Sequence, residues 1–118
     1  MMANRWKEKQ RGLAVERTYD PSRYAEIFGL IDDPRAGAIL GILMQILEGY
    51  LYVGSVMFYP DDDLYSVLGI DQNEISDVIE SVVKRLGHNN PSQPVHTRPV
   101  SSVGELFEVV MELDHRLP

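Results

Sequence analysis

The strongest constraint on the fold is a complete set of helix signals that begins at Ile70. Asp71 and Glu74 have the spacing of a capping box, and Ile70 and Ile75 have the spacing of a hydrophobic staple. Apolar side chains then recur every three or four residues, at Ile75, Val78, Ile79, Val82 and Leu86. The segment therefore predicts an amphipathic helix over 71–86 whose apolar stripe packs on a core.

Similar start signals occur elsewhere in the chain. Asp20 and Asp33 each precede a proline, which places an N-cap carboxylate before a residue that needs no N–H at the first helical position. Ser102 and Glu105 form a second capping-box pattern. These signals and the apolar periodicity predict further helices over 20–31, 34–48, 61–68 and 102–116.

Two segments favour extended structure, and one has no apolar period. Residues 50–59 are rich in Tyr, Val and Phe, and residues 95–100 are compatible with a short edge strand. Residues 1–19 are expected to form a basic, flexible arm. The 118-residue chain therefore predicts one mainly α domain over 20–118 with a small β contribution. The expected core comprises Ile27, Phe28, Ile39, Leu43, Leu47, Leu64, Leu68, Ile75, Ile79, Val82, Leu86, Leu106 and Val110.

The charge is distributed unevenly along the chain. Residues 1–23 carry six basic and three acidic side chains, whereas residues 24–118 carry five basic and fifteen acidic side chains. This asymmetry indicates an interaction arm on an acidic body, or an arm that docks on its own body or on a second copy.

Several classes of function are not expected. The chain has no cysteine, which excludes disulfides, thiol nucleophiles and cysteine-based zinc sites. The three histidines, His88, His96 and His115, lack metal-ligand spacing. The apolar stretch 37–59 contains Glu48, and a carboxylate inside a bilayer is costly. We therefore expect a cytoplasmic protein that is not an enzyme, has no metal or cofactor and does not enter a membrane.

Residues 64–86 have the order of a helix-turn-helix: a short helix, a turn at Gly69 and a longer helix. The segment from Ala25 through Asp33-Pro34-Arg35 to Leu40 is similar to the opening of ArsR-type winged-helix repressors. The segment Leu68 to Ser76 resembles the turn and the start of the recognition helix in that family. The resemblance implies a winged helix-turn-helix domain that regulates transcription as a homodimer on double-stranded DNA, with dimerisation through the C-terminal helix.

The resemblance also implies a set of contacts with DNA. Gln72, Asn73 and Ser76 fall at positions that face the major groove, where amides and hydroxyls pair with base edges. The expected phosphate contacts are made by basic residues of the body and the arm. These residues are Lys84, Arg85, Arg98, Arg5, Lys7, Lys9 and Arg11. The chain departs from the family in three respects: Asp77 stands where a basic residue is common, the metal-sensing cysteines are missing, and Tyr65 stands near the turn where a small residue is usual.

The alternative is an acidic module that is not an enzyme and that binds a basic protein as an inhibitor, adaptor or immunity-type protein. Its electrostatic face would comprise the aspartates at 61–63 together with carboxylates of the helix over 71–86. These residues are Asp61, Asp62, Asp63, Glu74, Asp77 and Glu80.

Overall fold

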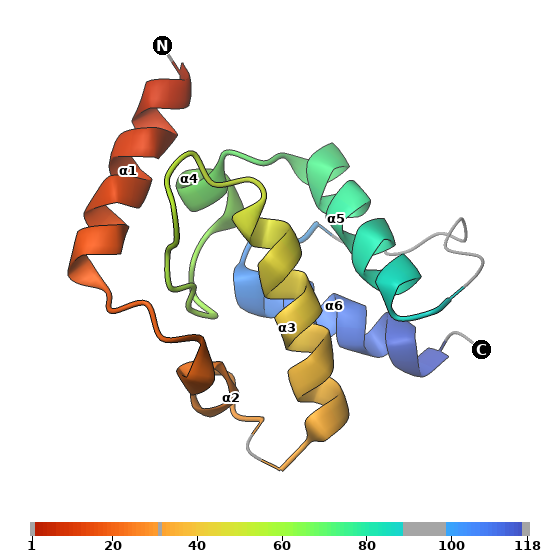
Figure 1. Cartoon of the computed structure of the whole chain (residues 1–118). Coiled ribbons are helices and arrows are strands. Elements are labelled where there is room, and N and C mark those ends of the chain that lie inside the picture. The colour runs from red at the N-terminus through yellow and green to blue at the C-terminus, as the bar shows by residue number, and fades with distance from the viewer. Residues whose placement is uncertain (1, 31, 89–98, 117–118) are drawn as a thin grey trace.

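Helix α3 (Pro34–Glu48) lies at the centre of the molecule (Figure 1). The computed structural model describes residues 2–30, 32–88 and 99–116. Asp33 caps α3, because its carboxylate accepts a hydrogen bond from the backbone N–H of Ala36 at 3.0 Å. Helix α3 has little polar surface because it buries side chains against several neighbours. The buried residues are Ala36, Ile39, Leu40, Leu43, Met44 and Leu47.

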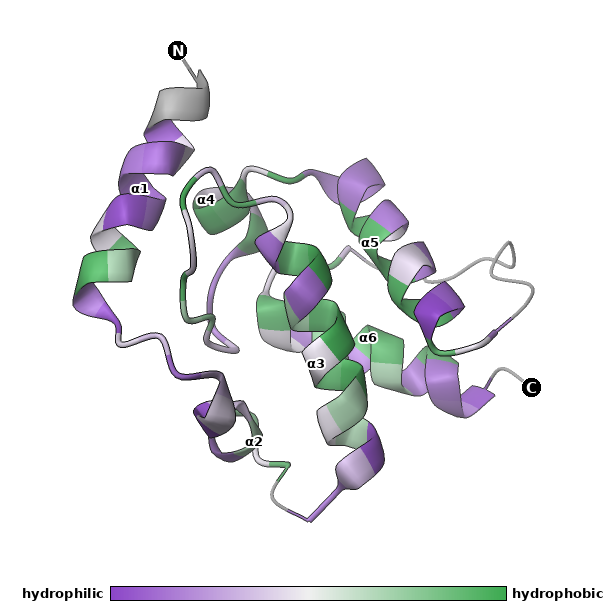
Figure 2. Ribbon diagram, in the orientation of Figure 1, coloured by the Kyte–Doolittle hydropathy of each residue, from purple (hydrophilic) through white to green (hydrophobic). Residues whose placement is uncertain are grey.

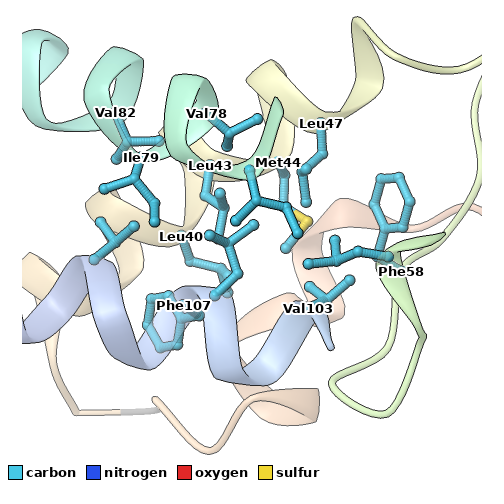
Figure 3. Packing of buried hydrophobic residues seen from close by; sticks show 14 of the residues in the cluster. Leu40, Leu43, Met44, Leu47, Phe58, Val78, Ile79, Val82, Val103 and Phe107 are labelled. Atoms are coloured by element: carbon cyan, nitrogen blue, oxygen red, sulfur yellow. The ribbon is translucent and has the colours of Figure 1, made fainter. Parts of the chain in front are cut away.

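Helices α5 (Gln72–Arg85) and α6 (Val103–Arg116) pack against α3 and against each other. Figure 2 shows that the apolar faces of these helices turn inward and that their polar faces turn outward. Leu43, Ile79 and Phe107, one from each helix, extend into the shared interior (Figure 3). The predicted core is confirmed, since ten of its thirteen members are buried and the other three pack partly buried against them.

Helix α4 (Leu64–Leu68) is joined to α5 by a tight turn at Gly69. Gly69 has a φ of +72°, which favours glycine, and its N–H donates to the carbonyl of Tyr65 at 2.8 Å. Ile70 is buried, and Asp71 caps α5 with both hydrogen bonds of a capping box. The predicted order of short helix, glycine turn and longer helix is therefore confirmed.

Helix α1 (Met2–Glu16) packs on α4, so the prediction of an arm without regular structure over 1–19 is wrong. Trp6, Gln10 and Leu13 are buried and share one face of α1. The Gln10 side chain donates from Nε2 to the carbonyl of Val67 at 2.8 Å and accepts from the N–H of Tyr52 at 2.7 Å. A polar residue at the centre of the buried face is the reason that the sequence shows no clear apolar period.

The helix predicted over 20–31 is shorter than expected. It consists of the 3-10 turn η1 (Pro21–Arg23) and the single α-helical turn α2 (Tyr24–Ile27). Gly29, with a φ of +71°, turns the chain away after α2. Tyr24 nevertheless anchors the segment, because it is buried and its hydroxyl oxygen accepts a hydrogen bond from the N–H of Phe58 at 3.0 Å.

The strand predicted over 50–59 is wrong, and the described residues contain no β-strand. Val56, Met57 and Phe58 are buried in succession, whereas a strand with one covered face would alternate. The backbone of this segment pairs with side chains instead of a second strand. For example, Arg17 donates to the carbonyl of Met57 at 2.9 Å, and the carboxylate of Asp62 accepts from the N–H of Tyr59 at 2.8 Å.

Most of the second predicted strand, over 95–100, lies outside the described residues. Pro99 and Val100 are described and are not part of a strand. A single antiparallel bridge, between Asp63 and Ser102, joins the start of α4 to the start of α6. The mainly α class is therefore established, while a winged arrangement with a β contribution is not.

Candidate interaction surfaces

The start of α5 carries the three side chains that the sequence assigned to base reading. Both ends of the Gln72 amide are engaged with the backbone of Val100: Nε2 donates to the carbonyl at 2.8 Å, and Oε1 accepts from the N–H at 3.2 Å. Asn73 is exposed, and Ser76 is half-buried. Gln72, although exposed, therefore fastens the start of α5 to the segment before α6, and Asn73 is the exposed amide without a hydrogen bond to the described residues.

The outer face of α5 continues with acidic side chains. Asp77 and Glu80 are exposed, whereas Glu74 is half-buried and completes the capping box by accepting from the N–H of Asp71 at 3.3 Å. Glu80 also lies 3.3 Å from the ammonium of Lys84, one turn further along the helix. Negative charge therefore gathers on α5 between Glu74 and Glu80.

The basic residues of α5 lie near its C-terminal end. Lys84 is 61% exposed, and Arg85 donates from Nη1 to Oε1 of Gln45 in α3 at 3.3 Å. Cations at this end of a helix interact favourably with its dipole. These two residues are accessible for phosphate contacts, but one of them already shares its charge with Glu80.

The carboxylates of α5 act electrostatically on one aromatic side chain, Tyr50. Tyr50 follows α3 and is half-buried. Its pKa is raised, mainly by burial and additionally by the negative charges of Glu74 and Asp77. The sequence reasoning assigned Tyr50 to a strand and missed it as a surface residue. Tyr50 therefore adds an aromatic ring and a polar hydroxyl to the region influenced by the two carboxylates.

The three aspartates at 61–63 do not act as one acidic patch. Asp61 and Asp63 are exposed, and Asp63 caps α4 by accepting from the N–H of Ser66 at 2.8 Å. Asp62 is buried and holds Arg17 through two hydrogen bonds of 2.7 and 2.9 Å. This hydrogen bonding raises the pKa of the Arg17 guanidinium. The expectation that Asp62 faces a partner is wrong, because its carboxylate closes an internal ion pair.

The four basic residues assigned to the N-terminal arm lie on α1. Arg5 and Lys9 line a cavity of about 290 Å³ between α1 and α4, together with Trp6, Tyr65 and Ser66. Lys7 and Arg11 belong to the same helix but do not line this cavity. Arg98, the remaining predicted phosphate contact, lies outside the described residues. The sequence reasoning identified the cations but not the aromatic residues between them.

A cluster that the sequence did not predict joins the ends of three helices. Asp114 of α6 accepts two hydrogen bonds from Arg35 of α3, from Nε at 3.0 Å and from Nη2 at 2.6 Å. Nε2 of His88, which follows α5, lies 2.9 Å from Oδ1 of the same carboxylate. These partners, with Arg35 contributing most, lower the pKa of Asp114 to about 2. The cluster has no signature in the sequence because its members are far apart along the chain.

A second cavity, of about 370 Å³, separates residues 19–25 from α3. Gly37, Gly41 and Met44 of α3 form part of its wall, and the Tyr19 hydroxyl donates to Glu48 at 2.9 Å near the end of that helix. None of the residues that line this second cavity has a cationic side chain. The lining combines small and apolar residues with the polar side chains of Ser22, Gln45 and Glu48.

The apolar run 109–111 lies on α6, the helix expected to mediate dimerisation, and is covered within one chain. Val109, Val110 and Leu113 are buried, and Met111 is partly buried against the core. These side chains pack against the chain's own core. The run therefore gives no separate argument for a second copy.

Comparisons with models of protein families, with curated proteins and with solved structures found no match. None of the helices in the described part of the chain combines the length and the apolar character that crossing a bilayer requires. Within residues 2–30, 32–88 and 99–116, no three acidic or histidine side chains are grouped as ligands of a metal ion.

Proposed function

We propose that this chain is a protein-interaction module that binds a basic protein through the carboxylates of α5 between Glu74 and Glu80. The observation that carries the proposal is the contrast on this helix between exposed carboxylates and an amide held by hydrogen bonds. Asp77 and Glu80 are exposed, whereas Gln72 is held by the backbone of Val100. Most of the chain around this surface is acidic, since residues 24–118 carry fifteen acidic and five basic side chains.

The surface has the elements that recognition of a basic partner requires. Carboxylates accelerate the encounter with a positively charged surface and disfavour acidic competitors. The half-buried Tyr50 is near enough to Glu74 and Asp77 for their charges to raise its pKa, so its ring is a candidate platform for an arginine of the partner. A short, rigid, capped helix presents these groups without a large loss of conformational entropy.

The test compares an arginine-rich peptide with a random-sequence DNA duplex at low and moderate salt. The peptide is expected to bind, with an affinity that falls as salt screens the charges. Neutralising the surface with Asp77→Asn and Glu80→Gln should weaken peptide binding at least about fivefold, since each lost charge pair contributes roughly 0.5–1 kcal/mol.

A matched control separates the α5 surface from the overall charge. Glu108→Gln and Glu112→Gln remove two exposed carboxylates from α6 and change the net charge by the same amount. This control should leave binding within about twofold, because charges beyond a Debye length of the site are largely screened. Equal weakening by both double variants would contradict a specific surface on α5.

The second candidate is a winged-helix DNA-binding regulator that acts as a homodimer. It is supported by the helix, glycine turn and helix over 64–85, by the exposed Asn73 and by Lys84 and Arg85 near the end of α5. The carboxylates of α5 weigh against it because carboxylates repel phosphates. Saturable duplex binding that Asn73→Ala alters in sequence preference would favour this candidate over the first.

A further inference from the structure

The cavity between α1 and α4 has the opposite charge to the α5 surface. It is bordered on α1 by Arg5 and Lys9, which lie one turn apart and share one side of that helix. Both side chains are exposed, and neither forms an ion pair with any described carboxylate. Two neighbouring cations repel each other, and an anion between them replaces this repulsion with attraction.

The same cavity has an aromatic wall of defined geometry. The Trp6 and Tyr65 rings meet edge to face, with their centroids 5.5 Å apart and an interplanar angle of 88°. Trp6 is buried and its Nε1–H donates to the carbonyl of Tyr65 at 2.7 Å, whereas the Tyr65 side chain is 49% exposed. Tyr65 therefore presents a fixed ring to whatever occupies the cavity, because Trp6 supports it from behind.

Ser66 supplies a hydroxyl on the α4 side of the cavity. The backbone N–H of Ser66 is already bound to the carboxylate of Asp63 at 2.8 Å. This carboxylate disfavours a second negative charge at the start of α4, so an anionic group is expected on the α1 side, at Arg5 and Lys9. A polar, uncharged part of a ligand fits the side of Ser66.

We propose that this cavity binds a nucleotide unit. The phosphate lies between Arg5 and Lys9, and the base stacks on Tyr65 within reach of the Ser66 hydroxyl. Proteins that bind nucleotides without reading their sequence use two kinds of contact. Basic side chains pair with the phosphate, and aromatic rings stack on the base. A volume of about 290 Å³ is at the lower end of ligand sites, which limits the occupant to one nucleotide unit. That unit is either a free mononucleotide or part of a single strand.

The experiment uses the fluorescence of Trp6, which is the single tryptophan of the chain and lies in the cavity wall. The full chain is titrated with adenosine monophosphate, adenosine, inorganic phosphate and a short single-stranded oligoadenylate. Adenosine monophosphate should change the fluorescence saturably and bind more tightly than adenosine or phosphate alone. The oligoadenylate should bind more tightly than the monophosphate if a strand is the source of the unit, and equally per site if a free nucleotide is.

Variants on α1 provide matched pairs of charge changes. The double variant Arg5→Gln/Lys9→Gln should weaken binding at least about tenfold, because hydrogen bonds to charged groups are lost. The double variant Lys7→Gln/Arg11→Gln removes the same charge from the same helix outside the cavity and should change binding by no more than about twofold. Both pairs leave the buried face of α1 intact, which circular dichroism checks.

A second pair tests the stacking, with calorimetry as the readout. Tyr65→Phe should retain the affinity for adenosine monophosphate, and Tyr65→Ala should reduce it about tenfold. Three results would overturn the proposal: no saturable binding of any phosphate-bearing probe up to about 5 mM, equal affinity for phosphate and adenosine monophosphate, or equal weakening by the two α1 double variants. None of these variants touches α5, so the outcome is independent of the binding proposed for that helix.

Discussion

Trp6 of α1 donates its indole N–H to the backbone carbonyl of Tyr65 in α4 at 2.7 Å, and its ring lies directly against Gly69. One side chain thus contacts both α4 and the turn that leads into α5. The contact fixes α1 in register with α4, which places Arg5 and Lys9 at the cavity instead of leaving them on a free segment. The position of the basic residues therefore depends on a contact between residues far apart in sequence.

Trp6→Ala is expected to lower the free energy of unfolding by about 3–5 kcal/mol, the range for truncation of a buried large aromatic side chain. The measurement is urea denaturation followed by circular dichroism, because the variant has no tryptophan. Val15→Ala on the same helix is the control: Val15 is 89% exposed and its truncation should cost no more than about 0.5 kcal/mol. Equal stability of both variants would show that α1 is not packed on α4.

Gly69→Ala should destabilise the chain more than Gly29→Ala. The two glycines have φ values of +72° and +71°, so both substitutions carry the cost of the left-handed region, about 1–2 kcal/mol. A Cβ at Gly69 would also lie 2.6 Å from Cδ2 of Trp6, whereas a Cβ at Gly29 meets nothing within 4 Å. This overlap should add about 1–3 kcal/mol.

A double variant isolates the overlap at Gly69. In a Trp6→Ala background, Gly69→Ala and Gly29→Ala should cost the same, because the ring that the new Cβ would meet is gone. Denaturation of the parent chain, of Trp6→Ala and of both glycine variants in each background measures this coupling. A difference that persists without Trp6 would assign the sensitivity of Gly69 to another contact.

Local signals were sufficient to predict α3, α5 and α6. Each of these helices begins at a cap whose partners lie within three residues, as the Asp33, Asp71 and Ser102 side chains show. Helix ends and apolar stripes are properties of a short window, so the sequence contains the information. Burial of the predicted core follows from the same periodicity.

Long-range pairing accounts for what the sequence did not predict. Gln10 is fully buried because its partners are Val67 and Tyr52, and a lone polar residue gives no sign of such partners. The segment over 50–59 has the composition of a strand, yet its backbone groups bond to side chains such as those of Arg17 and Asp62. Both kinds of information contribute to the candidate sites. The α5 carboxylates were predicted from local signals, whereas the aromatic residues near the charges are brought there by the fold and were not predicted.

Gln72→Ala is expected to lower the free energy of unfolding by about 1–2 kcal/mol, because two hydrogen bonds to the backbone of Val100 are lost. Asn73→Ala is the matched control, since the exposed Asn73 amide has no hydrogen bond to the described residues; it should change stability by no more than about 0.5 kcal/mol. Thermal and chemical denaturation provide the measurement. If Gln72→Ala is as mild as the control, the amide is not committed to Val100 and is available for base reading.

The stability of the chain should fall on acidification through the titration of Asp114. The pKa of this carboxyl is about 2 in the folded chain, against 3.8 for the ordinary group, because Arg35 and His88 favour its charged form. A lowered folded pKa stabilises the native state fully above about pH 4, and this contribution disappears as the pH falls toward about 2. Asp114→Asn removes the titration. The difference in unfolding free energy between the parent chain and this variant should therefore be largest near pH 5 and shrink as the pH falls from about 4 toward about 2.

Arg35→Gln should give an intermediate profile, because His88 still contacts the carboxylate. Denaturant midpoints measured at several pH values provide the test, and parallel profiles for the parent chain and Asp114→Asn would contradict a charge-stabilised Asp114.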